Sequence, residues 1–273
     1  MTSFAMIAFA ANSLLCRLAL KHTDIDAASF SVVRLASGAL VLWLMCALRR
    51  PSTSIKGSWK GAAALFIYVF AFSFAYVHLE TGTGALLLFG AVQLSMVLYG
   101  LFKGERMHGL AIVGLVLALG GLVSLLLPGA TAPDLFSAVT MLLSGLAWGI
   151  YSLLGKTVQD PLATTAGNFI RATPLVLLAS VPFVSGLRWD PLGIFYAVLS
   201  GAVASGVGYA VWYVAVRQLA SFQGATVQLS VPILASLGGI IFLGESLSMR
   251  MLLASVAVLG GIALVLGSKP SQR

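Results

Sequence analysis

Charged side chains are scarce in this sequence. Of its 273 residues only 9% are Asp, Glu, Lys or Arg, whereas 59% are apolar, and the mean hydropathy is +1.02. A soluble domain carries roughly 25% charged residues, so this composition excludes an ordinary soluble enzyme, a disordered chain and a nucleic-acid-binding protein. It predicts a membrane protein whose main surroundings are the lipid bilayer.

Cysteine, histidine and acidic residues are also few. The two cysteines, Cys16 and Cys46, stand in apolar stretches without metal-ligand spacing, so we expect neither a disulfide framework nor a metal site. An intramembrane enzyme needs a nucleophile and base, a metal cluster or paired acids at membrane depth. No such set appears in the sequence, so we expect no catalytic residue and no cofactor.

Apolar stretches long enough to cross a membrane, about 20 residues each, fill most of the chain. The predicted spans are 3–20, 28–48, 58–79, 82–102, 108–127, 134–156, 163–184, 190–216, 221–243 and 249–268. The connections between them are short. The chain therefore has no room for a separate soluble domain.

Basic residues are unevenly shared between the two sides of these spans. With the N-terminus inside, the inner loops and tail hold ten of them, and the outer loops hold four. The outer four are Arg17, Lys21, Arg188 and Arg250. Because cytoplasmic loops are enriched in Lys and Arg, this distribution predicts that both termini are cytoplasmic. The net charge of +8 is therefore explained by basic residues that orient the spans in the membrane.

The sequence repeats itself at a nearly constant spacing. The motif FKGE at 102–105 recurs as FLGE at 242–245, and the Gly-Gly pair at 120–121 recurs at 260–261, both at a spacing of 140. Arg34 parallels Arg171 at a spacing of 137. The repeats are residues 1–129 and 130–273, each with five spans, and an odd number of spans inverts the second repeat. We therefore predict an all-α membrane protein of ten transmembrane helices, in two inverted-topology five-helix repeats around a central cavity, an architecture typical of secondary transporters.

These motifs, together with the segment LSVPIL at 229–234, resemble the drug/metabolite transporter superfamily of EamA type. Within it, the sequence is most similar to bacterial amino-acid exporters. The resemblance implies that spans 1–4 and 6–9 enclose the cavity while spans 5 and 10 support it from outside, in a bacterial inner membrane. Val92 stands where the second repeat has Pro232, so a proline-hinge role carries over to the ninth span only.

Polar and aromatic side chains inside the spans are the candidate substrate-binding residues, because lipid-facing positions favour aliphatic side chains. The candidates are Asn12, Tyr76, His78, Gln93, Trp148, Tyr151, Tyr209, Trp212, Tyr213 and Gln228. Two groups on single helix faces lie at i, i+3 and i+4 spacing: 148, 151 and 152, and 209, 212 and 213. Alternatives stay open: an interfacial aromatic belt for Tyr76, an interfacial hydrogen bond for His78, and helix packing for the amides.

Five further residues are predicted to serve structure or gating. Arg34 and Arg171 are the charges well inside spans, each near enough to an end to snorkel toward the headgroups. Contact with the substrate stays open for either arginine, because intramembrane charge is often functional. Glu105 and Glu245 each precede a span and are predicted to cap its N-terminus. Pro232 is the fifth.

All eight acids fall in loops or at span ends, and the cavity helices carry few basic residues. Such a cavity disfavours quaternary cations and phosphorylated solutes, and it suits a small neutral or zwitterionic substrate. We therefore predict an exporter of amino acids, aromatic and hydrophobic ones included, or of similar metabolites, working by alternating access. Two alternatives for the mechanism stay open: uncoupled facilitated diffusion, and proton-coupled export of drugs or other metabolites. The oligomeric state, monomer or homodimer, also stays open. A channel and an intramembrane enzyme are the disfavoured alternatives.

Overall fold

The computed structural model describes residues 2–49, 55–104, 107, 109–129, 132–155, 158–216 and 227–268. Within these ranges the chain forms helices and no strand. The helices are α1 (Thr2–His22), α2 (Ala27–Arg49), α3 (Trp59–Ala75), α4 (Thr81–Phe102), α5 (Gly109–Leu126), α6 (Leu135–Gly155), α7 (Pro161–Ser180), η1 (Val181–Gly186), α8 (Pro191–Val198), η2 (Leu199–Val207), α9 (Gly208–Val216), α11 (Ser230–Leu243) and α12 (Met249–Gly267).

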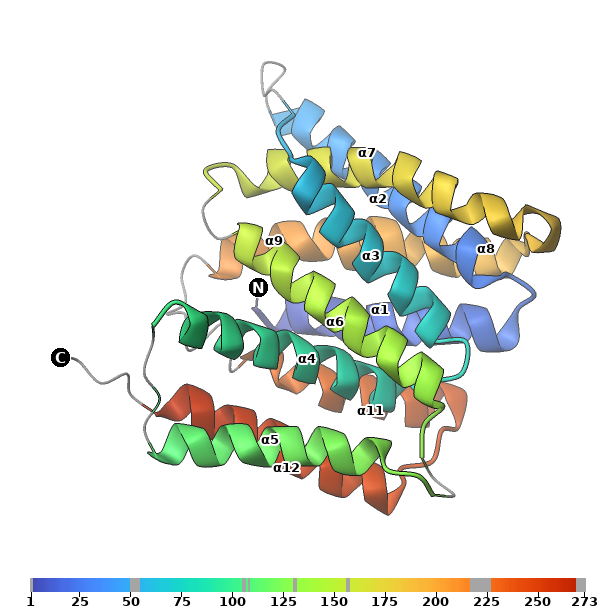
Figure 1. Ribbon diagram of the computed structural model, residues 1–273. Helices are drawn as coiled ribbons and strands as arrows, with labels where there is room; N and C mark the ends of the chain where they lie inside the picture. Colours follow the sequence, from blue (N-terminus) through green and yellow to red (C-terminus); the bar gives the residue numbers. More distant parts are fainter. Residues whose placement is uncertain are drawn as a thin grey trace.

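The helices run back and forth between two ends of one bundle (Figure 1). We call the end at which α1 begins and α12 stops the terminal end, and the opposite one the far end. In the described ranges, eight of the predicted spans coincide with helices that are long and apolar enough to cross a membrane. The other two fall on shorter apolar helices, α3 with 17 residues and α11 with 14.

Acidic residues start several of these helices. The carboxylates of Asp26, Asp134, Asp160 and Asp190 accept hydrogen bonds from backbone N–H groups in the first turns of α2, α6, α7 and α8. A carboxylate there satisfies N–H groups that lack partners within the helix and complements the helix dipole. Their positions at helix starts explain in physical terms why these acids stand at the ends of spans.

Helices α5 and α12 lie side by side at one edge of the bundle (Figure 1). A Cβ atom on Gly261 would stand 2.5 Å from the Gly114 carbonyl oxygen, so glycine is what permits this close approach. The first glycine of each Gly-Gly pair, Gly120 or Gly260, faces open space. The second of each pair faces the partner helix, so the repeated motif marks the α5–α12 contact.

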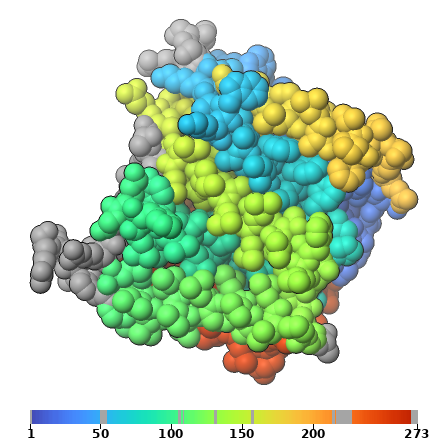
Figure 2. All heavy atoms as spheres, in the orientation of Figure 1, coloured from blue at the N-terminus to red at the C-terminus, as the bar shows by residue number. Residues whose placement is uncertain are grey.

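The outer surface of the bundle is apolar. Along α5, for example, Val113, Val116 and Val123 are each more than half exposed, and Figure 2 shows α3, α5 and α6 sharing one outer face. In contrast, α4 is buried on all sides from Thr81 to Leu94. A surface of exposed aliphatic side chains around a buried central helix is typical of an integral membrane protein.

Two helices depart from regular α-geometry. Between α8 and α9 the segment η2 forms nine residues of π-helix, which the sequence had predicted as part of one continuous span. Helix α7 contains Pro174 in its interior. Pro232 lies in the first turn of α11, and residues 227 and 228 just before this helix are also helical, with a turn at 229. The proline therefore follows a break between two helical segments, and its hinge role stays a prediction.

Candidate functional site

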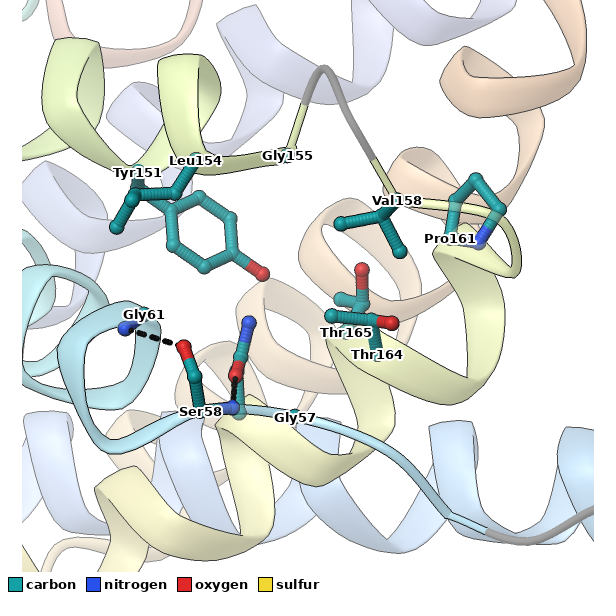
Figure 3. A pocket seen from close by; sticks show the side chains of 11 residues that line it. Gly57, Ser58, Gly61, Tyr151, Leu154, Gly155, Val158, Pro161, Thr164 and Thr165 are labelled. Carbon is teal, nitrogen blue, oxygen red and sulfur yellow. Dashed lines mark hydrogen bonds between the residues drawn. The ribbon is translucent and has the colours of Figure 1, made fainter.

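A cavity of about 230 Å³ opens near the terminal end, between the start of α3, the end of α6 and the first half of α7 (Figure 3). Its lining residues are Gly57, Ser58, Gly61, Tyr151, Leu154, Gly155, Val158, Pro161, Thr164, Thr165 and Asn168. None of these residues is charged. We call this space the terminal cavity.

Polar groups of the terminal cavity are held in place by the backbone of α3. The Ser58 N–H donates to Asn168 Oδ1 at 2.9 Å, and Ser58 Oγ accepts from the Gly61 N–H at 3.0 Å as the N-cap of α3. The Tyr151 hydroxyl points into the space from α6, toward Thr165 (Figure 3). The cavity therefore offers hydroxyl and amide groups in fixed orientations on one side and aliphatic groups on the other.

An aromatic cluster closes the centre of the bundle. The ring of Trp148 lies 5.5 Å from that of Tyr151, 5.0 Å from that of Tyr209 and 4.8 Å from that of Tyr68, between centroids. These distances are typical of favourable aromatic pairs. Because Trp148 stands directly behind Tyr151, the cluster separates the terminal cavity from the middle of the protein.

A second space, which we call the central cavity, lies inside this cluster. It is lined by Phe9, Asn12, Tyr68, Phe72, Leu88, Phe89, Trp148 and Tyr209. Its volume of about 10 Å³ leaves room for about one water molecule. A substrate would therefore require the surrounding helices to move apart.

Polar contacts tie α1 to η2 beside the central cavity. Asn12 Nδ2 donates to Ser205 Oγ at 3.1 Å, and the Ser200 hydroxyl donates to Asn12 Oδ1 at 2.6 Å. Both polar atoms of the Asn12 side chain thus have partners on η2. The π-helical turns position these two serines toward α1.

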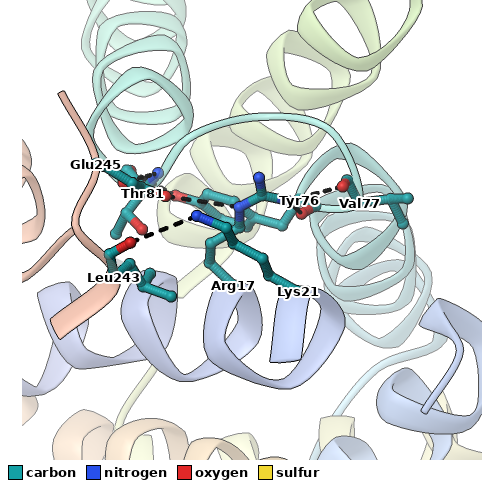
Figure 4. A network of polar contacts seen from close by, with 7 residues as sticks. All are labelled: Arg17, Lys21, Tyr76, Val77, Thr81, Leu243 and Glu245. Atoms are coloured by element: carbon teal, nitrogen blue, oxygen red, sulfur yellow. Dashed lines mark hydrogen bonds and ion pairs between the residues drawn. The ribbon is translucent and has the colours of Figure 1, made fainter. Parts of the chain in front are cut away.

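The far end is closed by a polar network that joins the two halves of the chain (Figure 4). Arg17 Nε lies 3.5 Å from Glu245 Oε1, and Arg17 Nη1 donates to the carbonyls of Tyr76 and Val77 at 3.0 and 2.7 Å. Glu245 Oε2 accepts from the Thr81 N–H at 2.8 Å. We call this group of contacts the far-end latch. It links α1, the α3–α4 turn, the start of α4 and the α11–α12 connection.

Glu80 is a further carboxylate at the mouth of the far end. Burial raises the pKa of its carboxyl group, and the negative charge of Glu245 raises it further, while Arg17 and Lys21 oppose the shift. Glu80 therefore lies within electrostatic reach of one carboxylate, Glu245, and of two cations, Arg17 and Lys21.

Of the predicted substrate residues, the structure brings four together around the two cavities. Trp148, Tyr209 and Asn12 line the central cavity, and Tyr151 lines the terminal cavity. Trp212 packs beside them, with its ring centroid 5.8 Å from that of Phe9. The side chain of Tyr213 lies outside the described residues.

Four other candidates line neither cavity. Tyr76 is fully buried near the far end, where its hydroxyl donates to the Thr81 carbonyl, so it is neither a cavity residue nor a belt residue. His78 is exposed in the α3–α4 turn. Gln93 is buried in α4, and Gln228 is half-buried just before α11. Sequence position gave their depth but not the direction in which they point.

The predicted structural residues behave differently from one another. Arg171 does reach the terminal end, where its Nη1 donates to the carbonyls of Lys56 and Gly167. Arg34 does not snorkel, because it is fully buried. Glu245 caps α4 and not the helix that follows it, whose N-cap is Ser248. Glu105 lies outside the described residues.

Several residues of the site were missed from the sequence. Tyr68 and Asn168 are polar residues inside predicted spans, and the rule applied to the other candidates would have found them. Ser58 precedes α3 as its N-cap, a recognisable signal. The charge distribution places Arg17 on the outer side, and no local pattern in the sequence indicates that it reaches Glu245. Among the described residues, no group of three His, Cys, Asp or Glu side chains lies close enough to hold a metal ion.

Comparison with known proteins agrees with this architecture. The EamA-like transporter family profile matches residues 135–267. An uncharacterized protein of Pseudomonas aeruginosa is 59% identical over 98% of this chain and 94% of its own length. The chain belongs to the EamA-like transporter family. It is thus an integral membrane transporter, of the drug/metabolite transporter superfamily.

Other relatives of this EamA-like transporter are more distant. The threonine/homoserine exporter RhtA of Escherichia coli is 32% identical over 59% of this chain and 55% of its own length. The uncharacterized transporter YoaV of Bacillus subtilis is 22% identical over 88% of this chain and 87% of its own. A crystal structure of another protein, 19% identical, matches 96% of this chain and 98% of its own with a TM-score of 0.67, which supports the fold alone.

Proposed function

We propose that this EamA-like transporter exports amino acids or similar small zwitterionic or neutral metabolites across the bacterial inner membrane by alternating access. The observation that carries the proposal is the uncharged, hydroxyl- and amide-bearing terminal cavity, which ends on the aromatic cluster. Its volume is below the roughly 300–1,000 Å³ of sites for drug-sized ligands, so it suits a small solute. RhtA, which bears the name of an amino-acid exporter, is a relative over part of the chain.

Alternating access requires two gates that open in turn, and the bundle offers one at each end. At the terminal end Trp148 and Tyr151 stand between the cavity and the centre. At the far end the latch holds both halves of the chain together. The geometry corresponds to a transporter with its terminal side open as far as the aromatic cluster and its far side closed.

Ten spans in two inverted repeats remain part of the proposal, and the packing supports it. Exchanging each span with its repeat counterpart maps the α1–α11 contact onto α6–α4, and the α3–α7 contact onto the contact of α8 and η2 with α2. The pairs α2–α7, α4–α11 and α5–α12 map onto themselves. The excess of basic residues at the terminal end supports cytoplasmic termini.

Counterflow in proteoliposomes tests the proposal. Labelled L-threonine, L-homoserine and L-phenylalanine would be offered to vesicles preloaded with the same unlabelled compound, with and without a pH gradient. We expect saturable counterflow of at least one amino acid without a gradient. Absence of amino-acid counterflow, with flux of a quaternary ammonium drug or a nucleotide-sugar in its place, would refute it.

Proton coupling is the second candidate, and the carboxylate pair at the far end favours it. The pKa of Glu80 is raised by burial and by Glu245, which brings a proton-accepting group to the outer mouth. Net transport that requires the pH gradient and is lost in Glu80→Gln would support coupling. Equal transport rates with and without the gradient would exclude it.

A further inference from the structure

Arg34 is a buried charge in the middle of the protein. Its side chain is 0% exposed. Nη2 donates to the Tyr68 hydroxyl at 3.0 Å and lies 3.5 Å from Ser205 Oγ. The guanidinium carbon stands 4.7 Å from the ring centroid of Phe72 and 5.3 Å from that of Tyr68. Aromatic faces and hydroxyl groups therefore surround it.

No carboxylate balances this charge among the described residues. Their ion pairs join Arg17 with Glu245 and Arg49 with Asp160. Two of the three guanidinium nitrogens of Arg34, Nε and Nη1, have no hydrogen-bond partner. Burying an unpaired charge is strongly unfavourable, and intramembrane charges without a structural partner usually mark a substrate or ion pathway.

The guanidinium group lies behind the wall of the central cavity. Tyr68 and Phe72, which contact it directly, both line that cavity. Asn12, on the same wall, shares Ser205 with it. The aromatic rings of Trp148, Phe9 and Tyr209 form another part of the wall. Opening the cavity would thus present a guanidinium group and an apolar aromatic surface to the same ligand.

The backbone next to Arg34 is built to hold η2 close. A Cβ atom on Gly201 would stand 2.1 Å from the Arg34 carbonyl oxygen, so only glycine fits there without displacement. This contact belongs to the π-helical segment that carries Ser205. Single π-helical insertions are frequent at functional sites. Helix α2 and η2 therefore meet at the guanidinium group.

We infer that Arg34 binds the carboxylate of the transported substrate in the central site, which limits the substrate class to compounds with a free carboxylate. The Nε and Nη1 atoms of Arg34 carry N–H groups that no protein atom accepts, and a carboxylate is an anionic acceptor that forms strong charge-assisted hydrogen bonds with such donors. One arginine without a lysine or metal suits a singly charged carboxylate better than a phosphate. The aromatic cluster then receives the rest of the substrate. The inference rests on the proposed transport function.

Ligand binding to purified protein tests the inference. The shift in unfolding temperature would be titrated with L-threonine, L-homoserine and L-phenylalanine, with the amide of each, and with inorganic phosphate. The amide keeps the ammonium group and the side chain and loses only the anionic charge. Since a hydrogen bond to a charged group contributes roughly tenfold or more in affinity, we expect each amide to bind at least about 30-fold more weakly than its acid. Phosphate should not bind.

Two variants and a matched control complete the test. In Arg34→Gln the preference for acid over amide should fall to within about threefold, and in Arg34→Lys it should be intermediate. Arg171→Gln changes the repeat counterpart at the terminal end, and its preference should equal that of the wild type. The unfolding temperature without ligand reports whether each variant folds. If Arg34→Gln does not fold, the acid-over-amide preference of Arg34→Lys, compared with that of the wild type, tests whether Arg34 binds the carboxylate.

Three outcomes would overturn the inference. Equal binding of acids and amides by the wild type would refute carboxylate recognition while leaving the transport proposal intact. An unchanged preference in Arg34→Gln would move the carboxylate site elsewhere and leave Arg34 a structural role only. Failure of every acid and amide to bind would overturn the transport proposal, and the inference with it.

Discussion

The far-end latch predicts how strongly one charge controls the outer gate. Glu245 makes two contacts, an ion pair with Arg17 and a hydrogen bond from the Thr81 N–H. The substitution Glu245→Gln removes the charge while its side-chain oxygen can still accept from Thr81. It therefore weakens the latch without deleting the cap of α4.

The magnitude follows from the geometry of the ion pair. At 3.5 Å, two unit charges attract by about 5 kcal/mol at an effective dielectric constant near 20. The side chains of Arg17 and Glu245 are 12% and 6% exposed, and removing them from water offsets much of that attraction. Exposed pairs contribute about 0–1 kcal/mol, and loss of one partner of a buried pair costs about 3–5 kcal/mol. We take the free-energy cost of losing the Glu245 charge as about 2 kcal/mol, between these two cases. This cost corresponds to about a 30-fold shift of the equilibrium toward the open far end.

The thiol of Cys16 reports that opening. Cys16 is adjacent to Arg17 on α1 and is fully buried, and Cys46 is removed by Cys46→Ser. A water-soluble maleimide reaches Cys16 only when the far end opens, so its labelling rate follows the open population. We expect labelling about 30-fold faster in Glu245→Gln than in the parent.

A control pair at the other end separates gating from general loosening. Arg49 and Asp160 lie 3.8 Å apart with side chains 64% and 30% exposed, so Asp160→Asn should leave Cys16 labelling unchanged. If Glu245→Gln labelled at the parental rate with an unaltered unfolding temperature, the latch would not hold the far end closed.

Three further predictions concern the site, the packing and the pH dependence. Trp148→Ala should reduce counterflow at least tenfold, because it removes a ring that lines the central cavity and packs against Tyr151 of the terminal cavity, whereas Leu146→Ala on the exposed face of the same helix should keep wild-type rates. Gly201→Val should lower the free energy of unfolding by about 1–3 kcal/mol, measured by thermal unfolding, because its side chain would collide with the Arg34 carbonyl. Burial raises the pKa of Asp26, but hydrogen bonds outweigh it and the net pKa is lowered. Its charged form therefore contributes stability that is fully present above the unfolded pKa of about 4 and is lost as the pH falls below that value toward the lowered folded pKa. The unfolding temperature should therefore drop more on acidification below about pH 4 in the wild type than in Asp26→Asn.

Hydropathy predicted the helices well because membrane crossing imposes a length and a composition on each span. The predicted 28–48, for example, corresponds to α2 at Ala27–Arg49. It missed the π-helical η2, since a shift in backbone hydrogen bonding leaves composition unchanged. The predicted span 221–243 contains α11 at Ser230–Leu243, and its first six residues lie outside the described ones.

The site was predictable in part. Trp148 and Tyr151 were found because aromatic side chains deep in a helix need a reason other than the interfacial belt. The burial of Arg34 was not predicted, because its distance along α2 allowed snorkelling, whereas the packing of α3 and η2 against α2 encloses it. The partner of Glu245 was also unpredictable, since Thr81 is 164 residues away.

Reciprocal accessibility tests the central claim, that substrate passes between a terminal cavity and a latched far end, most directly. One protein would carry Cys46→Ser and Thr164→Cys, so that Cys16 reports the far end and position 164 the terminal cavity. With an amino acid that supports counterflow, position 164 should be labelled more slowly and Cys16 faster. Labelling of both positions that rises or falls together, or does not respond to the amino acid, would contradict alternating access.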